Sequence, residues 1–146
     1  MTKILPHSGF IKDGEHRYPI RVYYEDTDAG GIVYHANYLK YLERARTEML
    51  RLLGVDQGKM LAFKHADDVQ FVLRRAEVDY LGAARLDDVL MVHSRVVKVA
   101  GASFMVMQEI LRDAEILNKA LIKIGILGKE GRPVRIPAGM KEKFND

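Results

Sequence analysis

One long amphipathic segment, which begins near Asn37 and stops at Gly54, constrains the fold more than any other feature of the sequence. Its apolar side chains recur every three or four residues and form a single stripe, as in a helix with one buried face: Tyr38, Tyr41, Leu42, Ala45, Met49, Leu52 and Leu53. Asn37 is expected to cap the helix start, because its side-chain oxygen can accept a backbone hydrogen bond. Gly54 is a natural helix stop. Such a helix needs one broad apolar surface to pack against.

Strand-like segments lie before and after this helix. One strand is expected over residues 18–25, where Ile20, Val22 and Tyr24 alternate with other residues. Short links suggest antiparallel hairpins between the later strands. These strands are expected over residues 69–80, 89–99, 103–112 and 116–127, and a short helical stretch over 57–63. The pattern predicts an α+β fold in which one antiparallel sheet wraps around one long central helix.

The chain length fits one domain of 146 residues. Residues 1–17 are expected to form an N-terminal arm, and residues 18–146 a single domain. The segment 89–99 carries apolar residues on both faces of the expected strand, so the sheet needs a second partner besides the helix. A homo-oligomer is therefore expected, as a dimer or a tetramer.

Composition excludes several classes of function. The 23 Lys and Arg residues exceed the 20 Asp and Glu residues by only 3, and no basic cluster indicates a nucleic-acid partner. The absence of cysteine excludes disulfides, thiolate metal sites and a cysteine nucleophile. No segment has the length and apolarity of a membrane span or a signal peptide, so a cytoplasmic location is expected. The small positive excess suits an anionic ligand.

The turn between the first strand and the long helix, Asp26-Thr27-Asp28-Ala29-Gly30-Gly31, carries the residues best suited to chemistry. Asp28 or Asp26 can activate a water molecule or attack a carbonyl directly. Unpaired N–H groups at the helix start can stabilise the negative charge that develops on the carbonyl oxygen. The imidazole of His35 can orient the substrate or carry a proton. These groups together would suffice for acyl transfer to water.

Other interpretations of these residues are open at this point. An aspartate in a glycine-rich turn often bonds only its own backbone, and a histidine near a helix start is often structural. A calcium loop that starts at Asp26 would need a glutamate where Asn37 stands, so it is rejected. The five histidines are scattered, and no metal site is expected. Tyr34 can line an acyl pocket or pack in the core or at a subunit interface.

Two stretches then carry a resemblance to a known family: RVYYEDTDAGGIVYHANY over residues 21–38, and YLERARTEML over residues 41–50. Further similar segments are EVDY at 77–80 and ARLDD at 84–88. The chain resembles the Tol-Pal-associated (YbgC-like) acyl-CoA thioesterases, which are grouped with the 4-hydroxybenzoyl-CoA thioesterases in the hotdog superfamily. The resemblance spans roughly residues 18–140.

This resemblance implies the hotdog fold, a dimer or tetramer, and hydrolysis of acyl-CoA thioesters without a metal or redox cofactor. Asp28 matches the catalytic aspartate, acting as nucleophile or general base, and His35 matches the family histidine, whose backbone N–H polarises the thioester carbonyl. Gly31, Tyr34 and Glu43 are the expected substrate-binding positions. Asp26 is expected to be structural.

Other activities are compatible with the same fold. Acyl-carrier-protein thioesters are open as substrates beside acyl-CoA. A dehydratase with the same fold would use a different histidine and acid arrangement. The main alternative is a non-catalytic hotdog module that binds acyl-CoA in association with an envelope complex. Acyl-chain length and aromatic or aliphatic preference depend on a pocket that one sequence does not define.

Overall fold

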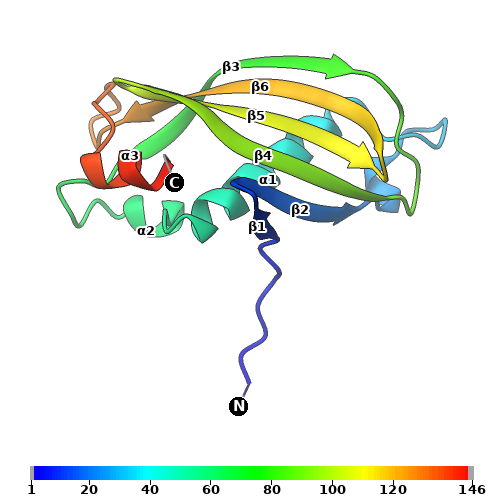
Figure 1. The fold of residues 1–146 in the computed structure, drawn as a ribbon, viewed down its shortest axis with the longest axis horizontal. Coiled ribbons are helices and arrows are strands. Elements are labelled where there is room, and N and C mark those ends of the chain that lie inside the picture. The colour runs from blue at the N-terminus through cyan, green and yellow to red at the C-terminus, as the bar shows by residue number, and fades with distance from the viewer. Residues whose placement is uncertain (1, 145–146) are drawn as a thin grey trace.

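The computed structural model describes residues 2–144, which form one curved sheet and the helices packed on it (Figure 1). Its strands are β1 (Phe10–Lys12), β2 (Glu15–Arg21), β3 (Gln70–Tyr80), β4 (Val89–Ala100), β5 (Ser103–Arg112) and β6 (Glu115–Leu127). Its helices are the 3₁₀ turn η1 (Tyr24–Asp26), α1 (Asn37–Leu52), α2 (Gln57–Met60) and α3 (Ala138–Phe144).

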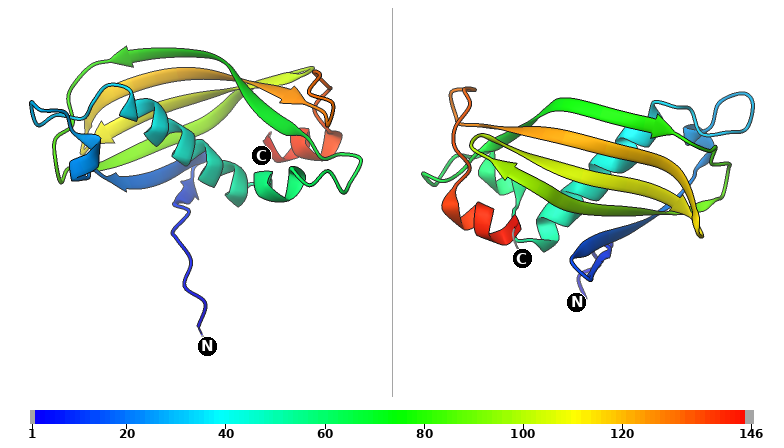
Figure 2. Two further views of the ribbon diagram at one scale, coloured as in Figure 1. Left: turned by 180° about the vertical axis from the view of Figure 1, so that it is seen from behind. Right: turned by 45° about the horizontal axis from the view of Figure 1, so that its top comes forward.

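The six strands lie in the order β1-β2-β4-β5-β6-β3, and every neighbouring pair is antiparallel. Helix α1 crosses one face of this sheet, as the view from behind shows most clearly (Figure 2, left). The predicted hotdog fold, an antiparallel sheet wrapped around one long helix, is thereby confirmed. β3 forms one edge of the sheet among the described residues, with β6 as its neighbour.

The core lies between α1 and the inner face of the sheet. Tyr41, Leu42 and Ala45 of the predicted helix stripe are at most 1% exposed. They meet fully buried residues of the central strands: Leu90, Val92, Phe104, Val106, Ile110, Ile122 and Ile126. Each large apolar side chain buried in this way contributes about 1.5–3 kcal/mol, so the helix stripe fixes how α1 sits on the sheet.

The first strand differs from its expected position. β2 begins at Glu15 and ends at Arg21, and Tyr24 lies in η1 instead of continuing the strand. Part of the expected arm also belongs to the sheet, because β1 pairs with β2 across Asp13 and Gly14. Both turn residues have positive φ, 53° and 75°, which is the geometry of a tight hairpin turn with the right twist. The Asp-Gly pair was the sequence signal for this hairpin.

The start of α1 also differs from the prediction, whereas its end agrees with it. The capping position is Ala36, and the side chain of Asn37 donates a hydrogen bond to the Asp26 carbonyl oxygen at 2.9 Å. Asn37 thus ties the helix to the preceding turn and does not cap it. Gly54 has φ 83° and its N–H donates to the Arg51 carbonyl, so it terminates the helix as predicted.

A buried glutamine fastens α1 to the sheet. The Gln108 side-chain amide donates to the Leu42 carbonyl at 3.0 Å and to the Ser94 hydroxyl at 2.9 Å. Its carbonyl oxygen accepts a hydrogen bond from the Arg46 guanidinium at 3.1 Å. Because Gln108 is fully buried, these bonds compensate the loss of its contacts with water.

His16, which is 1% exposed, gives a testable pH dependence. Its Nε2 lies 2.7 Å from the Ser8 carbonyl oxygen, so Nε2 carries the proton of the neutral ring. Burial lowers the pKa of His16 below its ordinary value of 6.5, and the hydrogen bond to Ser8 and the charge of Glu48 oppose this shift. Below pH 6.5 the unfolded chain therefore binds a proton that the folded chain excludes.

We predict that the free energy of unfolding falls as the pH decreases below 6.5, and that His16→Gln removes part of this slope. Glutamine can still donate to Ser8 but does not titrate. Urea unfolding at a series of pH values measures both proteins. Parallel pH profiles for the two proteins would contradict this role of His16.

Candidate active site

A closed loop joins η1 to α1 and carries most of the predicted site residues; it is the light-blue loop at the right of Figure 1. Thr27 and Val33 form a bridge across its base, and the Asp28 N–H donates to the Ile32 carbonyl at 2.8 Å. The Tyr34 N–H donates to the Asp26 carbonyl at 2.9 Å. These backbone bonds hold the loop against the start of the helix.

Asp28 lies at the exposed surface of this loop. Its Oδ1 accepts hydrogen bonds from the Gly30 N–H at 2.8 Å and the Ile32 N–H at 3.4 Å. Among the described residues, Oδ2 accepts none. The turn-forming role considered for Asp28 is therefore real, but it occupies only one oxygen. The other oxygen is oriented by the turn and open to a water molecule or a carbonyl carbon.

Asp26, by contrast, is buried and tied into the backbone. Its Oδ2 accepts from the Tyr23 N–H at 2.9 Å, and its carbonyl accepts from the Tyr34 N–H and the Asn37 side chain. Burial, and secondarily the Asp26 carboxylate, raise the pKa of the Tyr41 hydroxyl. Asp26 is surrounded by groups that fix the turn, which is consistent with the structural role expected for it.

The two glycines of the loop are required for different reasons. Gly31 has φ 83°, and a Cβ there would meet no atom within 4 Å, so the backbone conformation alone calls for glycine. At Gly30 a Cβ would come within 3.2 Å of Asp28 Oδ1. A side chain at Gly30 would disturb the oxygen that the turn holds.

His35 follows the loop and is also exposed. Its ring lies 4.5 Å from the Tyr34 ring and 6.4 Å from the Tyr80 ring, measured between centroids. The proximity of Tyr80, which comes from the far end of β3, was not predicted. Its sequence signal was the alternation along β3, which places Tyr80 on the same face as Val78.

The free amides lie before the helix and not in its first turn, and they include the His35 N–H that the resemblance implies. The N–H groups of Asn37 and Tyr38, the first two residues of α1, donate to the carbonyls of Tyr34 and His35. Within the described chain, the N–H groups of His35 and Ala36 have no such acceptor. The donors available to an anionic oxygen therefore belong to the residues just before the helix, among them His35 itself.

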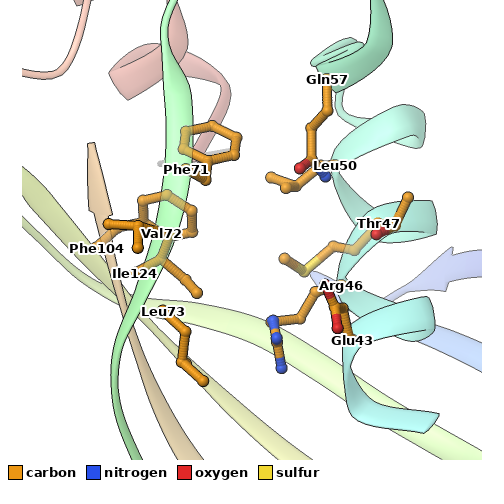
Figure 3. Close-up of a pocket in the computed structure, with 11 residues that line it drawn as sticks. Glu43, Arg46, Thr47, Leu50, Gln57, Phe71, Val72, Leu73, Phe104 and Ile124 are labelled. Atoms are coloured by element: carbon orange, nitrogen blue, oxygen red, sulfur yellow. The ribbon is translucent and has the colours of Figure 1, made fainter. Parts of the chain in front are cut away.

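Four of the five predicted site residues lie close together along the chain, and Glu43 lies apart from them. Asp28, Gly31, Tyr34 and His35 all lie in the loop or directly after it, and Tyr34 is 49% exposed. Glu43 is eight residues further along the helix than His35, a rise of about 12 Å. It lines a different feature, a cavity between α1 and β3 (Figure 3).

This cavity is also lined by Arg46, which is not among the site residues predicted from the sequence. Arg46 projects from α1 toward β3, where Phe71 and Leu73 form the opposite wall (Figure 3). Arg46 lies one turn after Leu42 and one turn before Met49, within the apolar side of the helix. A charged residue at such a position was the signal that could have identified it.

Residues 2–144 contain no group of three or more His, Asp or Glu side chains placed to hold a metal ion. None of the helices in that range combines the length and apolarity needed to cross a membrane.

The contrast between the two carboxylates predicts different effects on stability. Asp26→Ala leaves the Tyr23 N–H without its carboxylate acceptor and should lower the free energy of unfolding by about 1–3 kcal/mol. Asp28→Ala, at an exposed position, should lower it by less than about 1 kcal/mol. Chemical denaturation of both variants tests this, and a larger loss for Asp28→Ala would contradict the structural assignment of Asp26.

Comparisons with known proteins agree with this architecture. The chain is similar to the acyl-CoA thioesterase YbgC of Haemophilus influenzae, with 44% identity over 135 residues that cover 91% of this chain and 96% of the relative. The YbgC acyl-CoA thioesterase of Helicobacter pylori is 33% identical and covers 86% of this chain and 96% of its own length. Both relatives are matched over nearly their full length.

Solved structures show the same fold. A probable thioesterase from Bartonella henselae superposes with a TM-score of 0.80 at 35% identity, covering 84% of this chain and 99% of that one. A 1,4-dihydroxy-2-naphthoyl-CoA thioesterase from Synechocystis has a TM-score of 0.82 at 22% identity, covering 91% and 97% of the two chains, and at this identity it supports the fold alone. The sequence model of the thioesterase superfamily matches residues 30–117, more than half of the chain. The chain therefore belongs to the thioesterase superfamily.

Proposed function

We propose that the protein hydrolyses acyl-CoA thioesters to a free acid and a thiol, with Asp28 as the residue that activates or performs the attack. The observation that carries the assignment of Asp28 is its asymmetric carboxylate, with Oδ1 held by the Gly30 N–H at 2.8 Å and Oδ2 open. The similarity to relatives named acyl-CoA thioesterases supports the substrate class.

The chemistry follows from the groups of the loop. As a general base, Asp28 takes a proton from water while the water oxygen bonds to the thioester carbonyl carbon. The backbone N–H of His35 donates to the carbonyl oxygen, which becomes negatively charged in the tetrahedral intermediate. The carbon–sulfur bond then breaks, and the thiolate takes up a proton. The His35 imidazole orients the thioester or supplies that proton.

Direct attack by Asp28 is the second route open to the same geometry. The carboxylate oxygen would bond to the acyl carbon, expel the thiolate and form a mixed anhydride, which water then hydrolyses. Neither route needs a cofactor, and coenzyme A enters only as part of the substrate. Acyl-carrier-protein thioesters present the same reacting group and are alternative substrates. We place the reaction in the cytoplasm. Gly31 and Tyr34 would form part of the substrate-binding surface.

A second copy of the chain is part of this proposal. Asp28 and His35 are exposed in the single chain, whereas stabilisation of a developing charge works best where water is excluded. The edge strand β3 also presents exposed apolar residues, with Leu73 52% and Val72 38% exposed. A dimer or a tetramer would cover this edge and the loop together.

Sedimentation equilibrium tests the assembly. We expect the mass of at least two chains at micromolar concentration, because a long unpaired edge strand with apolar neighbours favours association. A single-chain mass over the whole concentration range in which the protein is active would contradict a shared site.

The activity prediction concerns Asp28. We expect Asp28→Asn to reduce thiol release from acyl-CoA by at least about 100-fold, because the amide cannot accept a proton or attack as a carboxylate does. Asp113→Asn, at an exposed hairpin turn, is the matched control and should retain the wild-type rate. His35→Ala should lower the rate by less, since its backbone N–H remains.

This experiment also separates the alternative function. A non-catalytic module that binds acyl-CoA would release no thiol above background, for the wild type and for every variant. Equal thiol release by the wild type and Asp28→Asn would leave the hydrolase activity in place but remove Asp28 from the mechanism.

A further inference from the structure

The cavity and the candidate site both lie along the flank between α1 and β3. At one end, the Tyr80 ring lies 5.8 Å from the Tyr38 ring and 6.4 Å from the His35 ring. At the other end, Phe71 and Leu73 face Arg46 across the cavity (Figure 3). α1 and β3 therefore border both ends of one surface path, which runs from His35 to Arg46.

Exposed apolar residues line this path. Leu39 lies one helical turn before Glu43 and so on the same side of α1, and it is 40% exposed. On β3, Leu73 and Tyr80 face inward, since their strand partners Ile124 and Asn118 are buried, yet they are about half exposed. An extended apolar chain that starts at His35 would cover these surfaces.

Arg46 lies at the far end of the path, and its positive charge has no paired carboxylate among residues 2–144. Burial lowers the pKa of its guanidinium, and the charge of Glu43 opposes this effect. Its one hydrogen bond to a side chain goes to the neutral amide of Gln108, and it forms no ion pair with any residue in the range 2–144. A guanidinium has five N–H donors, and a half-buried charge is stabilised by an opposite charge.

We propose that Arg46 binds a carboxylate at the far end of the acyl chain, so that the enzyme prefers acyl-CoAs of dicarboxylic acids over plain acyl-CoAs of the same length. The inference rests on the proposed thioesterase function, because the thioester end must lie at Asp28 and His35. Guanidinium and carboxylate match in charge and in geometry, through paired hydrogen bonds. The apolar residues that line the path would bind the methylene groups between the two ends.

The distance from His35 to Arg46 determines the length of acyl chain that fits. Arg46 follows His35 by eleven residues, which corresponds to about 16 Å along the helix. The long side chain of Arg46 leans back toward the helix start and shortens this span. An extended acyl chain of roughly eight carbon atoms therefore reaches from one end to the other.

Glu43 lines the same cavity as Arg46 and carries the opposite charge, so it provides a second test of the proposal. Its exposed carboxylate would repel the carboxylate of the ligand, although solvent weakens that repulsion. Neutralising Glu43 should therefore raise the preference for a dicarboxylic substrate, whereas neutralising Arg46 should lower it. If Arg46 served only to neutralise the charge of Glu43, neutralising Arg46 and neutralising Glu43 would not shift the substrate preference in opposite directions.

The test is a competition between matched substrates. The kcat/KM values for suberoyl-CoA and octanoyl-CoA, and for adipoyl-CoA and hexanoyl-CoA, are measured by thiol release. We expect Arg46→Met to lower the ratio of dicarboxylic to plain substrate at least about tenfold, mainly through KM, since a charge-assisted bond is lost. Arg46→Lys should restore part of the ratio, and Glu43→Gln should raise it. Arg51→Met, on the same helix but exposed and paired with Glu48, should leave the ratio unchanged.

The outcomes separate this inference from the proposed function. Equal losses on both substrate classes for Arg46→Met would assign Arg46 a structural role through Gln108 and overturn the inference, while hydrolysis itself would stand. If the wild type hydrolysed no acyl-CoA, calorimetric binding of free suberate would still test Arg46. Suberate binding that Arg46→Met abolishes, with thermal unfolding unchanged, supports the site, and no binding to the wild type overturns it.

Discussion

The packing of α1 against the inner face of the sheet is the interaction on which the rest of the molecule depends. Its stripe of Tyr41, Leu42 and Ala45 is completely buried, and Gln108 adds hydrogen bonds between the helix and the central strands. A helix fixed in this way presents its first residues at one end of the sheet and one flank to β3. The candidate site and the neighbouring cavity lie at these two places.

Two carboxylates in one turn have different surroundings, which suit them to different roles. Asp26 is buried, and its carboxylate accepts a hydrogen bond from the Tyr23 N–H. Its backbone carbonyl accepts hydrogen bonds from the Tyr34 N–H and the Asn37 side chain, so Asp26 holds the turn against the helix. Asp28 extends to the surface with one oxygen bound to the Gly30 amide. The rigid bonding of the first makes the second a well-oriented group, which is a requirement for general-base or nucleophilic attack.

In the proposed mechanism, the edge of the sheet would link catalysis to assembly. β3 has β6 on one side, and its inward-facing Leu73 and Tyr80 are about half exposed. The same residues border the path from His35 to Arg46. A second copy that covers this edge would exclude water from the loop, which strengthens the electrostatic effects proposed for the reaction, and it would enclose the acyl chain.

The sequence by itself predicted the long helix, the later strands and the candidate reacting turn. The helix stripe, the alternation of the later strands and the motif around Asp28 and His35 are local patterns, so they can be read without coordinates. The tertiary structure decided what each polar residue bonds to. Asn37 binds Asp26 instead of capping the helix, the N–H groups of Asn37 and Tyr38 are already bonded, and Arg46 meets the wall formed by Phe71 and Leu73. These contacts join residues that are distant in the chain or depend on backbone geometry, and no local periodicity encodes them.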